Sequence, residues 1–447
     1  MGGKYPPALH PEELSTVGQI TGWVILRCVF ATVTLVPAPF VWADLTYTLS
    51  LSGGDVFYER PYRLAAGSVG SVAALSSALG LEADELEEAL WLEERVRYKE
   101  RRVQKADGTQ RIVFSPCRLL RRVQGQINSR LFKAGGMLSW PSFVFGSLPN
   151  QEVDGNIDFR DYIACARRHA GARSILKVDI KDFFDNVTQP LVEEIFSEVF
   201  KYPPPVCEAL SNICCYEGHL VQGALTSSYL AALAFHNVEG RVVARLGYKR
   251  LTYTRYVDDI TVSSANASAN FDFAFSIIKE MVESKDLPLN MAKTMVLRAS
   301  TAPLVVHGLR ISSSQPRLQI KELSRIRAAV RRVENLAKEP NYRTAFGYRK
   351  DFNRCMGRVN KLARVGHSQH KSLVRRLRAI EPLPSPKDIE RIRDMISRLQ
   401  RDYGTKRNTY WYRARFYTVH ERLNILQRTF RGEAKNFRHQ MKSLLPS

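Results

Sequence analysis

Residues 252–264 read TYTRYVDDITVSS, and the two adjacent aspartates at their centre limit what this segment can form. Thr, Tyr, Val and Ile favour β-strands, whereas Asp is depleted in them. Because consecutive residues of a strand point to opposite faces of a sheet, Asp258 and Asp259 can face one site only where the chain turns. The segment therefore predicts a hairpin with both aspartates at its tip, between a strand that ends at 256–257 and one that begins at Ile260.

A third aspartate, Asp179, lies near the end of the apolar run SILKVDI, which predicts a short buried strand beside this hairpin. Two carboxylates ~4 Å apart repel each other by about 4 kcal/mol at an effective dielectric of ~20, and a divalent cation relieves that repulsion. Oxygen ligands that leave open positions suit Mg²⁺. Two such ions can support an in-line phosphoryl displacement. The alternative is a plain turn that carries two solvated acids.

The charge of the chain points to a polyanionic partner. Among 447 residues, 66 Lys and Arg stand against 44 Asp and Glu, a net charge of +22. Lys and Arg gain affinity for nucleic acids by releasing the counterions condensed on phosphates. Together with the carboxylates, the charge predicts a nucleic acid and its nucleotide precursors as substrates; the alternative is a merely basic soluble protein.

Cysteine usage favours a reducing compartment, and hence the cytoplasm. The seven cysteines are odd in number, two of them are adjacent at 214–215, and no C-x-x-C pair suggests a structural zinc. Residues 20–43 are nearly long and apolar enough to cross a bilayer, but Arg27, Pro37 and Pro39 interrupt them. We interpret this segment as buried core or a docking segment, with a membrane anchor as the less favoured alternative.

The remaining patterns predict a mixed α/β body followed by a basic helical region. The expected elements are two short helices in 71–96 that break near Gly80, a hairpin around Asp107–Gly108, an Arg-rich helix in 116–132, a helix around 270–284, and helices from Lys321 onward with an interruption at 381–387.

Five segments, taken in order, resemble the successive motifs of a reverse transcriptase of the bacterial retron-type branch, which includes defence-associated enzymes. They are KVDIKDFFD (177–185), HLVQGALTSS (219–228), RYVDDITVSS (255–264), NMAKT (290–294) and VHGLRIS (306–312). The resemblance covers roughly residues 70–365. It implies an α+β right-hand polymerase with an N-terminal extension (1–70), fingers and palm (71–320), and a basic helical thumb and C-terminal RNA-binding region (321–447).

The same resemblance implies the metal site. Asp179 and Asp258 are similar to the two direct metal ligands of the family, and Asp259 is similar to the supporting acid. Ile180 joins them in the implied metal site. The expected cofactors are two Mg²⁺ ions, with Mn²⁺ as the alternative.

Residues that resemble the family's substrate contacts form a larger set. The nucleotide-binding set is Lys105, Arg111, Phe184, Gln222, Gly223 and Lys293, and the primer grip is His307 and Gly308. Among them, Phe184 is similar to the aromatic gate beneath the sugar 2′ position. Phe184 and its neighbour Phe183 could instead be core aromatics, Gln222–Gly223 only a turn, and the cations solvated surface charges.

Two motifs depart from the retron pattern. The segment CARRH (165–169) stands where those enzymes usually carry Asn-Ala-x-x-His, and VHG (306–308) stands where they carry Val-Thr-Gly. The loop 219–228 also lacks the prolines common in the family. These departures favour a related defence-type enzyme.

Helical segments beyond Lys321 place apolar residues on one face and Arg on the other, with Tyr and Trp interleaved. Arg binds phosphates bidentately and aromatic rings stack on unpaired bases, which predicts RNA or hybrid binding. The leading hypothesis is an RNA-directed DNA polymerase that acts with a cognate non-coding RNA in antiphage defence. The alternatives are a retron or intron-type enzyme of the same chemistry, or a catalytically silent RNA-binding scaffold. Expected partners are the RNA template, the DNA product and dNTPs; a homo-oligomer or a partner defence protein stays open, and a membrane is not expected.

Overall fold

The computed structural model describes residues 58–446 apart from 66, 105–107, 109, 134–136 and 154. The segment 20–43 and most of the expected N-terminal extension lie outside the described residues, as does Lys105. Within the described part, no helix has the length and apolar character needed to cross a membrane.

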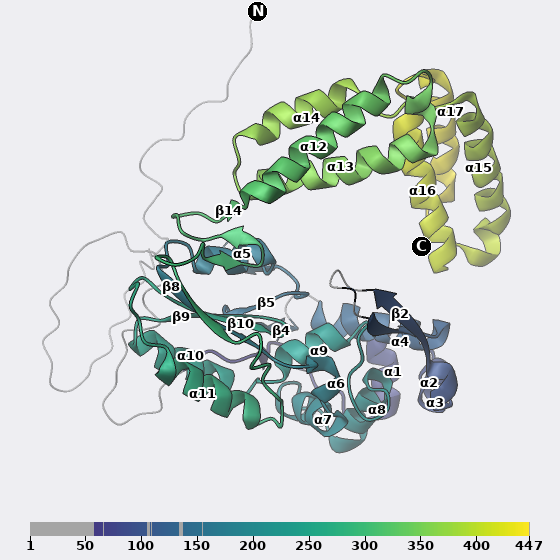
Figure 1. Ribbon diagram of the computed structural model, residues 1–447. Coiled ribbons are helices and arrows are strands. Elements are labelled where there is room, and N and C mark those ends of the chain that lie inside the picture. Colours follow the sequence, from purple (N-terminus) through teal and green to yellow (C-terminus); the bar gives the residue numbers. More distant parts are fainter. Residues whose placement is uncertain are drawn as a thin grey trace, which may run out of the picture. The chain divides into compact units, whose positions relative to one another are not determined.

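The largest sheet of the described chain has five strands and lies among the elements before Ile320 (Figure 1). Its strand order is β11-β8-β10-β9-β5, and only the edge pair β5–β9 is parallel. The strands are β5 (Val144–Phe145), β8 (Ser174–Asp179), β9 (Thr252–Tyr256), β10 (Asp259–Ser264) and β11 (Met295–Arg298). The apolar run in 174–180 thus forms the strand that its composition predicts, and it lies between β10 and β11.

Helices cover both faces of this sheet. α10 (Glu239–Tyr248) and α11 (Asp272–Glu283) lie against one face, where Ile260 and Val262 join the main core, and α5 (Tyr162–Arg168) lies on the other (Figure 1). On the α5 face, Ile175 packs in a smaller cluster with residues of α5 and of β12 to β14. Because side chains alternate along a strand, the face that meets α5 is also the face that carries Asp179 and Asp259.

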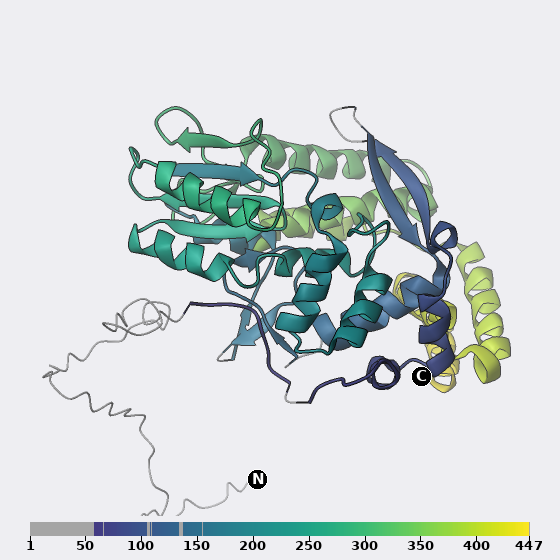
Figure 2. The same cartoon turned by 90° about the horizontal axis from the view of Figure 1, so that it is seen from below.

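The segment that precedes the sheet forms short helices and a two-stranded ribbon, which Figure 2 shows as a dark blue hairpin. Its elements are α1 (Val72–Leu79), α2 (Ala83–Leu90), α3 (Glu94–Arg97), β2 (Tyr98–Gln104), β3 (Gln110–Pro116), α4 (Arg118–Ile127) and a π-helical turn (Asn128–Phe132). Gly80 ends α1 with φ of +66°, a conformation that glycine adopts without strain. The expected helix break and the expected hairpin are both present.

Five helices connect β8 to the hairpin β9–β10, α10 among them, and several short strands join the larger elements. The other four helices are α6 (Phe183–Asn186), α7 (Gln189–Glu198), α8 (Pro204–Cys214) and α9 (Ser227–Leu233). The short strands are β1 (Tyr62–Arg63), β4 (Leu138–Ser139), β6 (Gln151–Val153), β7 (Asn156–Asp158), β12 (Val305–Val306), β13 (Leu309–Arg310) and β14 (Arg317–Leu318).

From Ile320 onward the described chain is helical and forms two groups, each with its own apolar core. The first group is α12 (Ile320–Ala337), a 3-10 turn (Tyr342–Thr344), α13 (Phe346–Arg364) and α14 (Gln369–Ala379). The second is α15 (Pro386–Lys406), α16 (Tyr410–Leu426), α17 (Arg431–Met441) and a 3-10 turn (Lys442–Leu444). Residues 321–447 carry 32 Lys and Arg against 11 Asp and Glu, whereas residues 1–320 carry 34 against 33. Almost the whole net charge of the chain therefore belongs to these helices.

Candidate active site

The β9–β10 hairpin turns one residue earlier than its sequence predicts. β9 ends at Tyr256, β10 begins at Asp259, and these two residues pair with each other, so the turn is Val257–Asp258. Val257 has φ of +58°, a region that a β-branched residue rarely adopts. Only Asp258 therefore lies in the turn itself, while Asp259 is the first residue of the returning strand.

The contacts around Val257 explain why the turn forms there. Its N–H donates to Phe145 O at 3.3 Å, and its carbonyl accepts from Arg255 Nη1 at 3.2 Å. Arg255 is fully buried and forms an ion pair of 2.6 Å with Glu239 of α10. A Cβ at Gly146 would lie 2.8 Å from Val257 Cγ2, so glycine leaves room for the turn. Tertiary contacts thus hold a local conformation that the sequence does not favour.

The register of the sheet brings the aspartates together. Asp259 lies directly opposite Asp179 in the antiparallel pair β10–β8, and both side chains point to the α5 face. Next to them, Ile180 N donates to the carbonyl of Asp258 at 3.1 Å, which ties the turn to the end of β8. Three carboxylates expected from the sequence therefore meet at one end of the sheet.

Asp179 is held from the side by a short loop after α11. Lys293 Nζ lies 3.0 Å from both carboxylate oxygens of Asp179, and Asn290 Nδ2 donates to Oδ2 at 3.0 Å. Asn290 N also donates to the carbonyl of Asp179 at 2.8 Å. Sequence reasoning found Lys293 but missed Asn290, although both belong to the segment NMAKT.

The electrostatics of this cluster fit divalent cations. Desolvation, then the negative charges of Asp258 and Asp179, raise the pKa of Asp259 to about 6, even though 55% of its side-chain surface is exposed. Burial, then Asp179, raises the pKa of Asp258. The hydrogen bond to Asp179 raises the pKa of Lys293. One ammonium does not neutralise three carboxylates, and the donors are all oxygens, so the residues suit Mg²⁺ or Mn²⁺.

The β2–β3 hairpin and the loop 219–226 pack against each other. Phe114 N of β3 donates to Gln222 O at 2.7 Å. Gly223 has φ of +112°, and a Cβ there would lie within van der Waals overlap of Phe114 O, at 2.2 Å. Arg111 lies on the same strand, and its positive charge partly offsets the burial that raises the pKa of Asp258. The structure thus packs the loop of Gln222 and Gly223 against the strand that carries Arg111.

Two polar residues of the Arg-rich helix and the turn after it hold this loop, and sequence reasoning missed both. Gln124 is fully buried, accepts from Leu225 N at 3.0 Å and donates to Tyr98 OH at 2.7 Å. Asn128 donates to Leu225 O at 2.7 Å. A Gln and an Asn on the apolar face of an amphipathic helix are the signal that could have identified them, because buried amides require partners.

The two adjacent phenylalanines of α6 have different environments. Phe183 is 2% exposed, and its ring stacks on Phe235 with centroids 6.1 Å apart. Phe184 is only partly buried and lies at the edge of the same core. The core-aromatic interpretation therefore holds for Phe183, and the role of Phe184 as a sugar gate stays a prediction.

His307 and Gly308 form the turn between β12 and β13, with φ of +46° and +80°. The His307 ring lies 4.5 Å from the ring of Tyr256, and its Nδ1 lies 3.8 Å from Asp259 Oδ2. Burial, then the charge of Lys177, lowers the pKa of His307 to about 4, so the ring is neutral near pH 7. The turn expected to grip the primer thus adjoins the aspartates.

Comparisons with known proteins identify the family. Residues 103–339 match the family model for reverse transcriptase (RNA-dependent DNA polymerase). The retron Ec48 reverse transcriptase of Escherichia coli is 40% identical over 404 residues, which cover 89% of this chain and 98% of that protein. The chain belongs to the retron-type reverse transcriptases. The retron Se72 reverse transcriptase of Salmonella heidelberg (strain 579083-10) is 28% identical, over 85% of this chain and 97% of that protein.

Among solved structures, a telomerase from Candida tropicalis in complex with a TWJ fragment of telomeric RNA superposes only in part. The alignment covers 79% of this chain and 65% of that chain, with 11% identity and a TM-score of 0.37. The assignment to the family therefore rests on the family model and on the sequence relatives.

Membership in the retron-type reverse transcriptases confirms the main expectations from the sequence. The fold is the α+β right-hand polymerase fold, the enzyme is an RNA-directed DNA polymerase, and its template is RNA. The departures at Cys165 and His307 do not remove the chain from the retron branch. The roles of individual residues are not shown by this membership and stay predictions.

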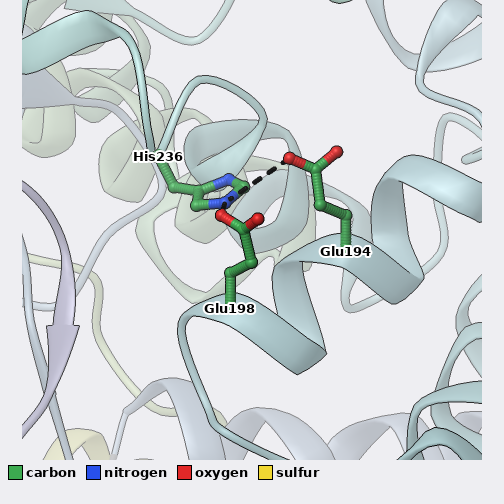
Figure 3. A group of neighbouring side chains, drawn as sticks. All are labelled: Glu194, Glu198 and His236. Carbon is green, nitrogen blue, oxygen red and sulfur yellow. Dashed lines mark hydrogen bonds and ion pairs between the residues drawn. The ribbon is translucent and has the colours of Figure 1, made fainter.

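A second group of ionisable side chains lies away from the aspartates, on α7 and just after α9 (Figure 3). Glu194 and Glu198 point toward His236, whose Nε2 lies 2.7 Å from a Glu198 oxygen and 3.8 Å from a Glu194 oxygen. Such a set could hold a cation, but the Lys285 ammonium already lies 2.6 Å from Glu194, and the hydrogen bond from His236 lowers the pKa of Glu198. The carboxylates are therefore already paired with His236 and Lys285, and the Lys285 contact connects α7 to the segment just after α11.

Proposed function

We propose that Asp179, Asp258 and Asp259 are the catalytic acids of this reverse transcriptase and that they bind two Mg²⁺ ions, for which Mn²⁺ can substitute. The observation that carries the proposal is the pairing of Asp259 with Asp179, with Asp258 in the adjoining turn. Ile180 contributes its carbonyl oxygen, the only donor it has to offer a metal. When bound, the ions activate the attacking hydroxyl and stabilise the leaving oxygen.

The nucleotide site lies between the aspartates and the β2–β3 hairpin in this proposal. Arg111, Lys293 and Lys105 supply positive charge for the triphosphate, and Lys293, which contacts Asp179, would face the pyrophosphate. Gln222 and Gly223 contact the incoming nucleotide and the template. Phe184 packs beneath the sugar, and His307 with Gly308 grips the primer.

A cognate non-coding RNA, bound by residues 321–447, is the proposed template and partner. The support is the net charge of +21 that these residues carry, from 32 Lys and Arg against 11 Asp and Glu. We place the reaction in the cytoplasm, since the six described cysteines are free thiols, and assign it to antiphage defence. A partner defence protein or a second copy of the chain completes the system.

The test of the catalytic assignment is Asp258→Asn, which keeps the shape of the side chain and removes its charge. DNA synthesis on an RNA template in Mg²⁺ should fall at least ~100-fold, because metal binding and charge stabilisation are lost together. Asp272→Asn at the start of α11 is the matched control and should retain activity. Comparable synthesis by Asp258→Asn and the unchanged protein would refute the assignment.

The test of the RNA assignment is to sequence the nucleic acid that copurifies with the full chain. One RNA species, enriched together with complementary DNA that Asp258→Asn does not make, is the expected result. Phage plating on cells that carry either form then tests defence. An RNA pool that matches bulk cellular RNA would contradict a cognate partner.

A further inference from the structure

A set of buried polar side chains lies beneath the α5 face of the sheet, next to the aspartates. Cys165 of α5 is fully buried, and its Sγ lies 3.2 Å from Thr254 Oγ1 and 3.4 Å from His307 Nε2. Burial raises the pKa of the Cys165 thiol to about 12, so it stays protonated and can donate a hydrogen bond. Cys165 therefore links α5 both to strand β9 and to the β12–β13 turn.

His169, at the end of α5, fastens the helix to both strands of the hairpin. Its Nε2 lies 2.7 Å from Thr254 Oγ1 and its Nδ1 lies 2.7 Å from Ser263 Oγ. The His169 side chain and both hydroxyls are buried, so a hydrogen bond lost here would leave an unsatisfied polar group. Thr254, which contacts both Cys165 and His169, is the centre of this network.

The network reaches the aspartates through His307. The imidazole contacts Cys165 on one side, and on the other its ring lies 4.5 Å from that of Tyr256, the last residue of β9. Its Nδ1 lies 3.8 Å from a carboxylate oxygen of Asp259, the first residue of β10. A continuous series of contacts thus runs from α5 to both ends of the catalytic hairpin turn.

Cys165 and His307, which contact each other in this series, are also the positions at which the segments 165–169 and 306–308 depart from the retron pattern that they resemble. Cys165 stands in place of Asn, and His307 stands in place of Thr, and these side chains touch each other. A short thiol here faces a large imidazole. Each single substitution would therefore disturb the contact. The longer side chain of Cys165→Asn would press on the His307 ring, and the shorter side chain of His307→Thr would leave a gap beside Cys165.

We propose that Cys165 and His307 form a coupled pair of positioning residues that holds the β9–β10 turn and the β12–β13 turn in one relative placement. The pair sets where Asp259 stands with respect to the primer end, and it takes no part in proton or group transfer. The inference rests on the proposed roles of Asp259 and of the turn His307–Gly308. A displacement of reacting groups by ~1 Å can cost about 100-fold in rate, so such a pair has a measurable effect.

The test measures single-nucleotide addition by the full chain on an RNA template with a DNA primer in Mg²⁺. Cys165→Asn and His307→Thr should each lower kcat about tenfold and raise the KM for primer–template, with the KM for dNTP unchanged. The double variant restores the family pair and should return to within about threefold of the unchanged protein, because contacting residues couple. Melting temperatures are measured for every variant.

Two further variants keep the test decisive where a large substitution unfolds the chain. Cys165→Ser keeps a hydrogen-bond donor facing Thr254 and His307 and should retain most activity, whereas Cys165→Ala should lose as much kcat as Cys165→Asn. Cys207→Ala is the matched control, since Cys207 is a buried cysteine whose Sγ contacts only a backbone oxygen, Tyr202 O at 3.3 Å, among the described hydrogen bonds. It should leave kcat unchanged.

The coupling would be overturned if the loss of kcat in the double variant equalled the product of the two single losses. Equal activity of Cys165→Ser and Cys165→Ala would overturn it as well. So would losses of kcat that only follow melting temperature across all variants, Cys207→Ala included. If Asp258→Asn remains active, the proposed function fails instead, and this outcome is separate from the coupling test.

Discussion

At the scale of single residues, the two adjacent phenylalanines of α6 differ in burial. Phe183 is buried and stacks on Phe235, whereas Phe184 lies at the rim of the core. A ring at the rim can meet a ligand, and a stacked interior ring cannot. Phe183 is therefore a packing residue, and Phe184 is free to take the proposed role of sugar gate.

Phe184→Ala should raise the ratio of ribonucleotide to deoxyribonucleotide incorporation while the melting temperature stays near that of the unchanged protein. If the ring lies beneath the sugar, a 2′-hydroxyl would overlap with it, and truncation removes that conflict. The measurement is kcat/KM for a ribonucleotide and for its deoxy form. An unchanged ratio with a lowered melting temperature would mean that Phe184 only packs.

Phe183→Ala is the matched control for this prediction. A stacked interior Phe contributes roughly 3–5 kcal/mol to the free energy of unfolding, so its truncation should lower stability and the use of both sugars together. The ratio of the two efficiencies should not change.

At the scale of elements, the position of the hairpin could be predicted from the sequence, but the position of its turn could not. Two acids in a β-favouring segment require a turn, which locates the hairpin. A valine with positive φ has no local signal, because the contacts that hold Val257 come from Arg255 and from Phe145 of another strand. Asn290 escaped sequence reasoning for the same reason, since its role depends on Asp179, a partner distant in the chain. Gln124 does carry a local signal, its place on the apolar face of α4, but its partner Leu225 is equally distant.

Gly223→Ala should separate the loop 219–226 from the β2–β3 hairpin and raise the KM for dNTP about tenfold. A Cβ at this position would lie 2.2 Å from Phe114 O, which is backbone of a paired strand and cannot move easily. Steady-state kinetics with a fixed primer–template measure the effect.

Gly218→Ala controls for backbone strain alone. Gly218 also has positive φ, +78°, but nothing lies within 4 Å of a Cβ there. Equal kinetic losses in the two variants would assign the effect to strain and would refute a specific contact between the loop and β3.

At the scale of the whole molecule, the net charge of the chain changes where the C-terminal helical region begins. Residues 1–320 are nearly neutral, with 34 Lys and Arg against 33 Asp and Glu, and residues 321–447 hold the rest of the +22. The sequence predicts a basic helical end, but its arrangement as two separate apolar cores follows only from tertiary packing. On one of these groups a pocket is lined by Arg431, Lys435 and Arg438 of α17, and no carboxylate lines it.

This distribution predicts how RNA binding by the full chain should respond to salt. Each phosphate neutralised by a Lys or Arg releases counterions, so the logarithm of affinity falls linearly with the logarithm of salt concentration. Replacing Arg431 and Lys435 together by Ala should weaken binding and make this slope shallower by about 2, one for each lost phosphate contact. Lys279→Ala on α11, an exposed lysine paired with Glu283, is the control and should leave the slope unchanged. The measurement is a filter-binding titration with the copurified RNA at several salt concentrations. A slope that the double variant does not change would show that the α17 pocket is surface charge without a role in RNA binding.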